Sequence, residues 1–213
     1  MASNQQALLM YGASQYQIAN SLRFRSSASA YLSRTPGSAG NRTTWTWSGW
    51  VKLGDVSTTN QTLFSASTGS ERTLLYYANN KFYFEYYNGS TYPLDISSVP
   101  VYRDPSAWYH VVCYVDTTQA TNTNGFRIYV NGVSQSLTYT TYTQNTQPNI
   151  NATVIHNIGR RSSGSDRYFD GYLADINFID GQALSPTAFG QYSPTTGVWI
   201  PASYTGTYGT NGF

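Results

Sequence analysis

The chain has 213 residues and a formal net charge of +2, and only 10% of it is charged while 16% is aromatic. The small charge and the lack of a basic run predict no nucleic-acid partner, and a single cysteine excludes an intrachain disulfide. No apolar stretch is long enough to span a membrane, and residues 1–20 lack the pattern of a secretory signal. Hydration carried by Ser, Thr, Asn and Tyr is typical of extracellular or virion β-proteins rather than of cytosolic enzymes.

The first third of the chain predicts a polar arm followed by short strands. Residues 1–20 are polar apart from the apolar patch at residues 8–11, and we expect an arm that contacts a partner. After alternating stretches near residues 22 and 31, residues 44–52 place Trp45 and Trp47 on one face of a strand and Trp50 on the other.

Asparagine-rich turns separate the strands of the middle of the chain. Asn79-Asn80, Asn88-Gly89 and Asn131-Gly132 each predict a two-residue hairpin, because Asn and Gly tolerate a positive φ. Alternating strands are expected at residues 61–67, 73–78, 81–87, 91–96, 125–130, 134–139 and 153–159. Residues 108–116 form a nearly continuous apolar run, which indicates a strand buried on both faces. Within this run we expect Cys113 to be buried and His110 to be a hydrogen-bonded core or interface residue. His156, in the strand at 153–159, is expected to be exposed.

Residues 167–185 predict a further strand. Its alternation places Tyr172, Ala174, Ile176 and Phe178 on one face, and Asp180-Gly181 turns the chain out of the sheet. Residues 187–192 suggest a short helical turn, and the remainder to Phe213 suggests coil. Many short strands with turn residues between them predict an all-β protein, an antiparallel β-sandwich.

Five motifs in order resemble the concanavalin A-like lectin/glucanase superfamily, and more narrowly its laminin G-like jelly-roll domains. They are WTWSGWVK at 45–52, WYHVVCYVD at 108–116, FRIYVNG at 126–132, IG at 158–159 and FDGYLAD at 169–175 leading to ALS at 183–185. SLRF at 21–24, YLSRTP at 31–36 and IDGQAL at 179–184 are similar to the version found in bacteriophage structural proteins. The resemblance covers residues 21–185, leaving an arm at 1–20 and a Tyr/Gly/Pro-rich extension at 186–213. Relatives of this kind often continue beyond such a point, which implies a truncated or naturally short form.

The acids do not match a glycoside hydrolase. The glucanase branch of the resembled superfamily places carboxylates at alternate positions of one strand, and glycosidic cleavage needs two carboxyl groups facing one groove. The chain has two glutamates, Glu71 and Glu85, and neither has an acid two or four residues away. We therefore expect no enzymatic activity.

The same resemblance implies a structural calcium in many relatives, held by an acid in the strand of residues 167–185. Asp175 and Asp170 are the candidate ligands here, since calcium prefers carboxylate and carbonyl oxygens. Many relatives have two adjacent acids at this place, whereas this chain has Ala174-Asp175. The alternative is that Asp175 is hydrogen-bonded to backbone without a metal.

Exposed aromatic residues with nearby polar groups are the candidate ligand site. Aromatic faces stack on sugar rings while polar groups bind hydroxyls, although a tyrosine-rich surface is equally suited to protein contact. The candidates are Trp50, Tyr83, Tyr87, Tyr92, Arg160, Arg161 and Tyr168.

Together these features predict a non-enzymatic bacteriophage virion protein, made in the host cytoplasm and displayed on the exterior of the particle. It would decorate a capsid or form a tail or fibre module, contacting other virion proteins, further copies of itself or host surface glycans. The alternatives are a free carbohydrate-binding lectin module and, with less support, a polysaccharide depolymerase.

Overall fold

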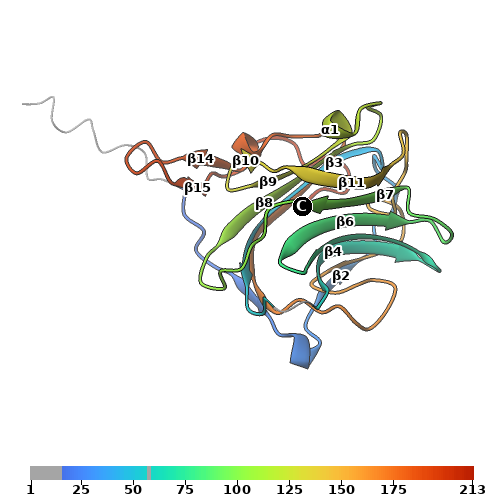
Figure 1. Cartoon of the computed structure of the whole chain (residues 1–213), viewed down its shortest axis with the longest axis horizontal. Helices are drawn as coiled ribbons and strands as arrows, with labels where there is room; N and C mark the ends of the chain where they lie inside the picture. Colours follow the sequence, from blue (N-terminus) through green and yellow to red (C-terminus); the bar gives the residue numbers. More distant parts are fainter. Residues whose placement is uncertain (1–15, 57–58) are drawn as a thin grey trace, which may run out of the picture.

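The computed structural model describes residues 16–56 and 59–213, and these form a sandwich of two antiparallel sheets (Figure 1). The six-stranded sheet has the order β1-β13-β3-β8-β9-β10 and the seven-stranded sheet the order β11-β7-β6-β5-β4-β12-β2. A separate hairpin pairs β14 with β15. The predicted all-β sandwich is therefore confirmed. The apolar patch at residues 8–11 lies outside the described residues.

The six-stranded sheet consists of β1 (Leu22–Phe24), β3 (Thr44–Leu53), β8 (Tyr109–Asp116), β9 (Phe126–Val130), β10 (Val133–Ser134) and β13 (Gly171–Asp180). The seven-stranded sheet consists of β2 (Leu32–Arg34), β4 (Gln61–Thr68), β5 (Glu71–Ala78), β6 (Lys81–Tyr87), β7 (Leu94–Ser98), β11 (Leu137–Tyr142) and β12 (Ile155–Ile158). The hairpin strands are β14 (Gly190–Tyr192) and β15 (Trp199–Pro201), and the helical turns are η2 (Ser26–Ala28), α1 (Asn122–Gly125) and η3 (Pro186–Ala188). No helix among the described residues has the length and apolar character that a membrane crossing requires.

Two of the three predicted hairpin turns are confirmed. Asn79 and Asn80 both have positive φ and join β5 directly to β6, and Asn131-Gly132 joins β9 to β10 in the same way. The two-residue turn at Asn88-Gly89 is wrong, because β6 ends at Tyr87 and β7 begins only at Leu94. The side chain of Asn88 accepts hydrogen bonds from Ser90 and Thr91 instead, and so builds a longer loop.

The core lies between the two sheets and is rich in aromatic rings. Trp45 and Trp47 of β3 are fully buried there, as the alternation of that strand predicted, and Trp45 contacts Phe84 and Phe178 at ring-centroid distances of 5.7 and 5.9 Å. Cys113 is buried in the same cluster.

The prediction that Tyr172, Ala174, Ile176 and Phe178 share one face of β13 is wrong, because a bulge separates the first two from the last two. The register with β3 shifts between Ala174 and Asn177, and Asp175 adopts a positive φ of 47°. A bulge adds an unpaired residue and reverses which side chains face inward. Leu173, Ile176 and Phe178 therefore contact the main core, while Ala174 lies in an outer cluster.

Residues beyond Ser185, expected to be coil after one helical turn, cover the outer face of the six-stranded sheet. Phe189 packs with Val112 and Ile179, and Trp199 packs with Trp50 and Ala174. The indole Nε1 of Trp199 donates a 2.9 Å hydrogen bond to His110 Nδ1. The alternation of β3 and β8 does not reveal this cover, because the polar residues Thr46 and Ser48 occupy part of the buried outer face.

A buried carboxylate joins four segments at one end of the sandwich. Asp180 accepts hydrogen bonds from the backbone N–H groups of Asn41 and Asn211 and from the side-chain amide of Asn151. The Asn211 amide in turn donates to the Asn151 side chain. A side chain at Gly40 would collide with Asp180 and Asn151, so this close approach requires glycine.

We predict that Trp199→Ala destabilises the fold by about 3–5 kcal/mol, because a large buried ring is lost and His110 loses its donor. Urea unfolding followed by tryptophan fluorescence and circular dichroism measures the change. The matched control is the neighbouring Val198→Ala. Val198 is 59% exposed, and its truncation should change the free energy of unfolding by less than about 0.5 kcal/mol. Equal effects of the two substitutions would show that the hairpin does not belong to the folded unit.

Candidate functional site

The outer face of the seven-stranded sheet gathers aromatic and charged side chains. Strand alternation places Phe82, Phe84 and Tyr86 of β6 in the core, so Tyr83, Glu85 and Tyr87 point away from it. In β5, Leu75 and Tyr77 are core residues, and the outward positions follow by alternation. We call the following residues the tyrosine–arginine face: Arg72 and Tyr76 of β5, Tyr83, Glu85 and Tyr87 of β6, and Tyr92 and Arg167 from loops.

Arg72 holds two tyrosines of this face in place. Its Nε donates a 3.0 Å hydrogen bond to Glu85 Oε1, and its Nη2 donates one of 2.8 Å to the Tyr92 hydroxyl. The guanidinium carbon lies 4.6 Å from the ring centroid of Tyr87, and the Tyr87 and Tyr92 rings are 4.9 Å apart. Tyr92 is nevertheless 41% exposed. The face thus presents aromatic surface that is already ordered, which lowers the entropic cost of binding.

A second aromatic pair lies farther along β5 and β6, beyond Leu74 and Glu85. Tyr76 and Tyr83 are opposite each other in the register, and their rings stack at 5.0 Å with 13° between the planes. Burial, together with the charge of Glu85, raises the pKa of Tyr76, so its hydroxyl keeps its proton. Arg167 Nη1 lies 3.9 Å from Glu85 Oε1, and the Arg167 guanidinium lies 5.9 Å from the Tyr76 ring.

The segment between β12 and β13 adds the remaining predicted residues beside the same sheet. Its backbone is attached to β4, because Thr62 N–H donates to Arg167 O and Ser65 Oγ donates to Arg160 O. The Arg160 guanidinium lies 3.7 Å from the Tyr31 ring centroid and 6.0 Å from that of Tyr168. A hydrogen bond with Arg160 is the main cause that lowers the pKa of Tyr168. Arg161 forms an ion pair with Asp166 within the segment.

Six of the seven predicted ligand residues therefore lie on or beside one sheet, and Trp50 does not. Trp50 belongs to the six-stranded sheet, is only 9% exposed, and stacks on His110 at 5.0 Å. It lines a separate cavity of about 560 Å³ with Trp108 and Ile18. Its place follows from the cover supplied by β15, which strand alternation alone does not reveal.

Sequence reasoning missed the charged centre of the face. Arg72 pairs with Glu85 across neighbouring strands, thirteen positions apart in the chain. Asp95 of β7 stands directly opposite Glu85 in the register. Spacing along one strand does not reveal such pairs, because side chains opposite each other on neighbouring strands are equally close. The turn at Asn79-Asn80, which pairs β5 with β6, is the sequence feature from which the contact between Arg72 and Glu85 could have been predicted.

His110 and Ser48 form a buried pair that cannot act as a nucleophile and its base. His110 Nε2 lies 2.9 Å from Ser48 Oγ, and its Nδ1 accepts from Trp199. An indole N–H only donates, so Nε2 carries the proton and donates to Ser48, the reverse of a serine hydrolase. Burial lowers the pKa of His110 to about 4. The prediction of a core histidine is confirmed.

His156 is buried, and the prediction that it is exposed is wrong. Its Nδ1 donates to Val154 O, and its Nε2 accepts from the backbone N–H of Asn151. Ile155 at the start of the same strand is the exposed position, so the strand presents the opposite face to the one expected. Burial lowers the pKa of His156 to about 4, so both histidines are neutral near pH 7.

The two candidate calcium ligands are engaged by hydrogen-bond donors. Asp170 Oδ1 forms a 2.8 Å ion pair with Arg23, and its Oδ2 accepts from the hydroxyl of Ser26. Asp175 Oδ1 accepts from the Tyr16 hydroxyl, and burial raises the pKa of Asp175. Within residues 16–56 and 59–213, no group of three or more His, Cys, Asp or Glu could hold a metal ion. Because their oxygens are bound by Arg23, Ser26 and Tyr16, the two carboxylates do not fit a calcium ion. The expectation of a structural calcium itself is untested.

Comparison with known proteins places this geometry among lectin-type folds. Residues 25–188 match the model of the concanavalin A-like lectin/glucanases superfamily. A comparison with curated protein sequences found no match.

Three solved structures share the fold at low sequence identity. A heptameric SAP-like pentraxin from Limulus polyphemus is 20% identical, with a TM-score of 0.52 over 73% of this chain and 71% of the pentraxin. Domains LG4-5 of the mouse laminin alpha1 chain are 15% identical, with a TM-score of 0.52 over 76% of this chain and 41% of theirs. Domain 4 of a GH43 extracellular arabinanase from Geobacillus stearothermophilus is 17% identical, with a TM-score of 0.50 over 69% of this chain and 65% of that domain.

We predict that excess EDTA leaves the melting temperature of the purified protein unchanged within about 1 °C, because Asp170 and Asp175 are already bound by protein groups. A bound structural ion would add a stabilisation proportional to ln(1 + [L]/Kd), and its removal would lower the melting temperature. Differential scanning calorimetry with EDTA, and with added CaCl2 after dialysis, measures the shift. Asp175→Asn serves as the matched variant. A drop of several degrees that calcium restores, and that Asp175→Asn abolishes, would establish the ion.

Proposed function

The chain belongs to the concanavalin A-like lectin/glucanase superfamily, and from this we propose that it is a non-enzymatic module that binds carbohydrate on its tyrosine–arginine face. The lectin-type fold supports a binding module. The arabinanase domain that shares this fold was solved in complex with arabinotriose, which is consistent with a saccharide ligand.

The observation that carries the proposal is the arrangement around Arg72. A saccharide presents apolar C–H faces and a rim of hydroxyls, and it needs aromatic surface beside charged donors and acceptors. Tyr87 and Tyr92 provide the aromatic surface, and Asp95 provides an acceptor on the neighbouring strand, while the buried Glu85 holds Arg72 in place. Because Glu85 and Tyr92 both hold the Arg72 guanidinium, the charged group beside the aromatic surface is ordered, which lowers the entropic cost of binding.

We further propose that this module belongs to a bacteriophage virion. The support is the resemblance of residues 21–24, 31–36 and 179–184 to phage structural proteins, together with the charged content of only 10%. The protein would be made in the host cytoplasm and placed on the outside of the capsid or tail. Other virion proteins and further copies of this chain would be its partners, and host surface glycans its ligand. A free lectin module is the alternative.

One observation favours a second candidate, a polysaccharide depolymerase. Glu85 and Asp95 stand opposite each other on the outer face, and glycoside hydrolases use two carboxyl groups about 5–9 Å apart. Against it, Glu85 Oε1 is bound by Arg72 and lies near Arg167. Glu85 is also only 7% exposed, which leaves its carboxyl group little access to a glycosidic oxygen outside the sheet. Binding is therefore the better supported activity.

We predict that Tyr92→Ala weakens binding of any saccharide identified on a glycan array by about tenfold, because one exposed stacking surface is lost. Isothermal titration calorimetry measures the affinity. Tyr192→Ala is the matched control, because Tyr192 is 54% exposed but lies on β14 beside the other sheet. No saccharide above background, or equal losses in both variants, would contradict the assigned face. New reducing ends that disappear in Glu85→Gln would show a depolymerase instead.

We predict that phage particles containing this chain hold it in a fixed copy number, as a decoration or tail module requires. Quantitative mass spectrometry of gradient-purified particles measures its ratio to the major capsid protein before and after a high-salt wash. A constant ratio through the wash is the expected result. Recovery of the chain only in the soluble fraction of the lysate would point to the free lectin.

A further inference from the structure

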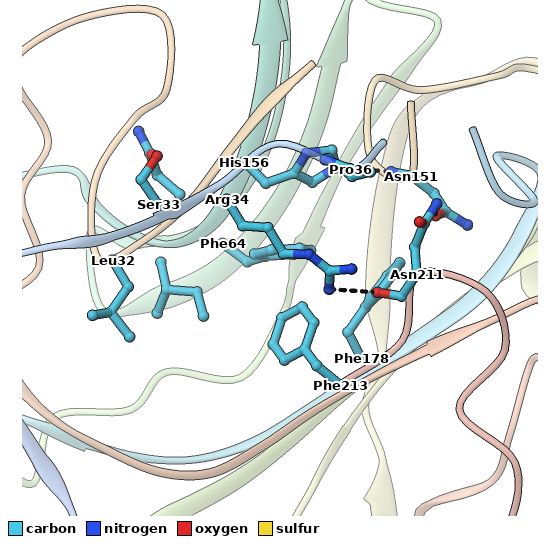
Figure 2. Close-up of a pocket in the computed structure, with 12 residues that line it drawn as sticks. Leu32, Ser33, Arg34, Pro36, Phe64, Asn151, His156, Phe178, Asn211 and Phe213 are labelled. Carbon is cyan, nitrogen blue, oxygen red and sulfur yellow. Dashed lines mark hydrogen bonds between the residues drawn. The ribbon is translucent and has the colours of Figure 1, made fainter. Parts of the chain in front are cut away.

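A cavity of about 220 Å³ lies at the edge of the sandwich where β2 and β12 meet the end of the chain (Figure 2). It is distinct from the tyrosine–arginine face, because the side chains of Phe64 and Ile158 that line it belong to the core between the sheets. Figure 2 shows Phe64, Phe178, Phe213 and Arg34 converging on the same space.

Three phenylalanine rings from distant parts of the sequence form one wall. Phe64 of β4 and Phe178 of β13 have centroids 5.5 Å apart, and Phe213 lies 5.9 Å from Phe178 and 6.5 Å from Phe64. Leu32 and Ile158 complete the apolar lining. An apolar cavity of about 150 Å³ in another protein binds benzene, so this space suits one six-membered ring with a small substituent.

Arg34 is the one charged side chain of the lining. Its Nη1 donates a 2.9 Å hydrogen bond to Asn211 O, and its guanidinium carbon lies 5.7 Å from the Phe213 ring. In the part of the chain that the structure describes, no carboxylate forms an ion pair with it. A guanidinium has five N–H donors in a fork that fits a carboxylate, so Arg34 retains donors for an anion.

The other polar side chains of the lining are used within the protein. Asn157, with its amide oriented to satisfy its neighbours, donates to His156 O and Ser33 Oγ and accepts from Arg160. Both ring nitrogens of His156 are hydrogen-bonded, to Val154 and to Asn151. The side-chain amides of Asn151 and Asn211 bond to each other and to the backbone, and Asn151 also bonds to Asp180. The free polar capacity of the cavity is therefore cationic, and its walls are aromatic.

We infer that this cavity binds a small aromatic carboxylate, with its ring among the three phenylalanines and its carboxylate on Arg34. Ring burial provides the non-directional part of the affinity, and the charged hydrogen bonds with Arg34 select the anion. This site is independent of the carbohydrate site, since it shares no residue with the tyrosine–arginine face.

The test uses benzoate as the probe, with benzyl alcohol and acetate as the ring-only and anion-only comparisons. Isothermal titration calorimetry on the full chain should give benzoate the tightest binding, benzyl alcohol weaker binding, and acetate none. Arg34→Met should weaken benzoate by about tenfold and leave benzyl alcohol within about twofold, because only the charged hydrogen bonds are lost. Arg25→Met is the matched control, because Arg25 is exposed on the neighbouring segment and does not line the cavity.

A second variant tests, independently of Arg34, whether benzoate occupies this cavity. Leu32 is 48% exposed and lines the cavity, so Leu32→Trp should fill it and abolish benzoate binding while the melting temperature is kept. Absence of benzoate binding to the wild-type chain would overturn the inference. Binding that survives Arg34→Met or Leu32→Trp unchanged would overturn it as well. Saccharide affinity should be the same with and without benzoate, so either site can fail without the other.

Discussion

The buried carboxylate of Asp180 is the interaction on which the arrangement of this sandwich depends. An isolated buried charge is very costly, and it is tolerated only when hydrogen-bond donors surround it. Asp180 finds its donors on the loop before β3, on the loop before β12 and on the end of the chain. Since these segments are far apart in sequence, satisfying one carboxylate requires them all to be in place. The same network sets Asn211 and Phe213 against the edge of the sandwich, and thereby forms the cavity beside Arg34.

The two outer faces of the sandwich differ in what covers them, and this cover determines how much aromatic surface each face exposes to a ligand. The outer face of the six-stranded sheet is covered by residues beyond Ser185, which bury Val112, Ile179 and Trp50. The seven-stranded sheet keeps exposed aromatic surface at Tyr92, although part of its outer face is crossed by the segment before β13. Trp50 thus serves in packing, whereas Tyr92 beside the other sheet stays exposed.

Charge is used sparingly in this protein and is locally compensated on the tyrosine–arginine face. Arg72 is neutralised by Glu85, and the same arginine orders Tyr87 and Tyr92. Such an arrangement favours a neutral ligand rich in hydroxyl groups over a strongly charged one. The edge cavity has the opposite character, because Arg34 has no acidic partner among the described residues and faces aromatic rings. The proposed carbohydrate face and the edge cavity therefore differ in charge, and we propose that they select ligands of different chemistry.

The sequence by itself determined the class of fold, the inward rows of β3 and β6, and the turns at Asn79-Asn80 and Asn131-Gly132, because period-two alternation and positive-φ residues are local properties. It also indicated Tyr83, Tyr87 and Tyr92 as members of one candidate ligand site. Only the tertiary structure decided the rest. The bulge at Asp175 reversed the faces of β13, the cover by Trp199 removed Trp50 from the surface, and the register placed Asp95 beside Glu85. Each of these depends on which distant segments come together, and burial of apolar surface and of one carboxylate selects that pairing over the many that local patterns allow.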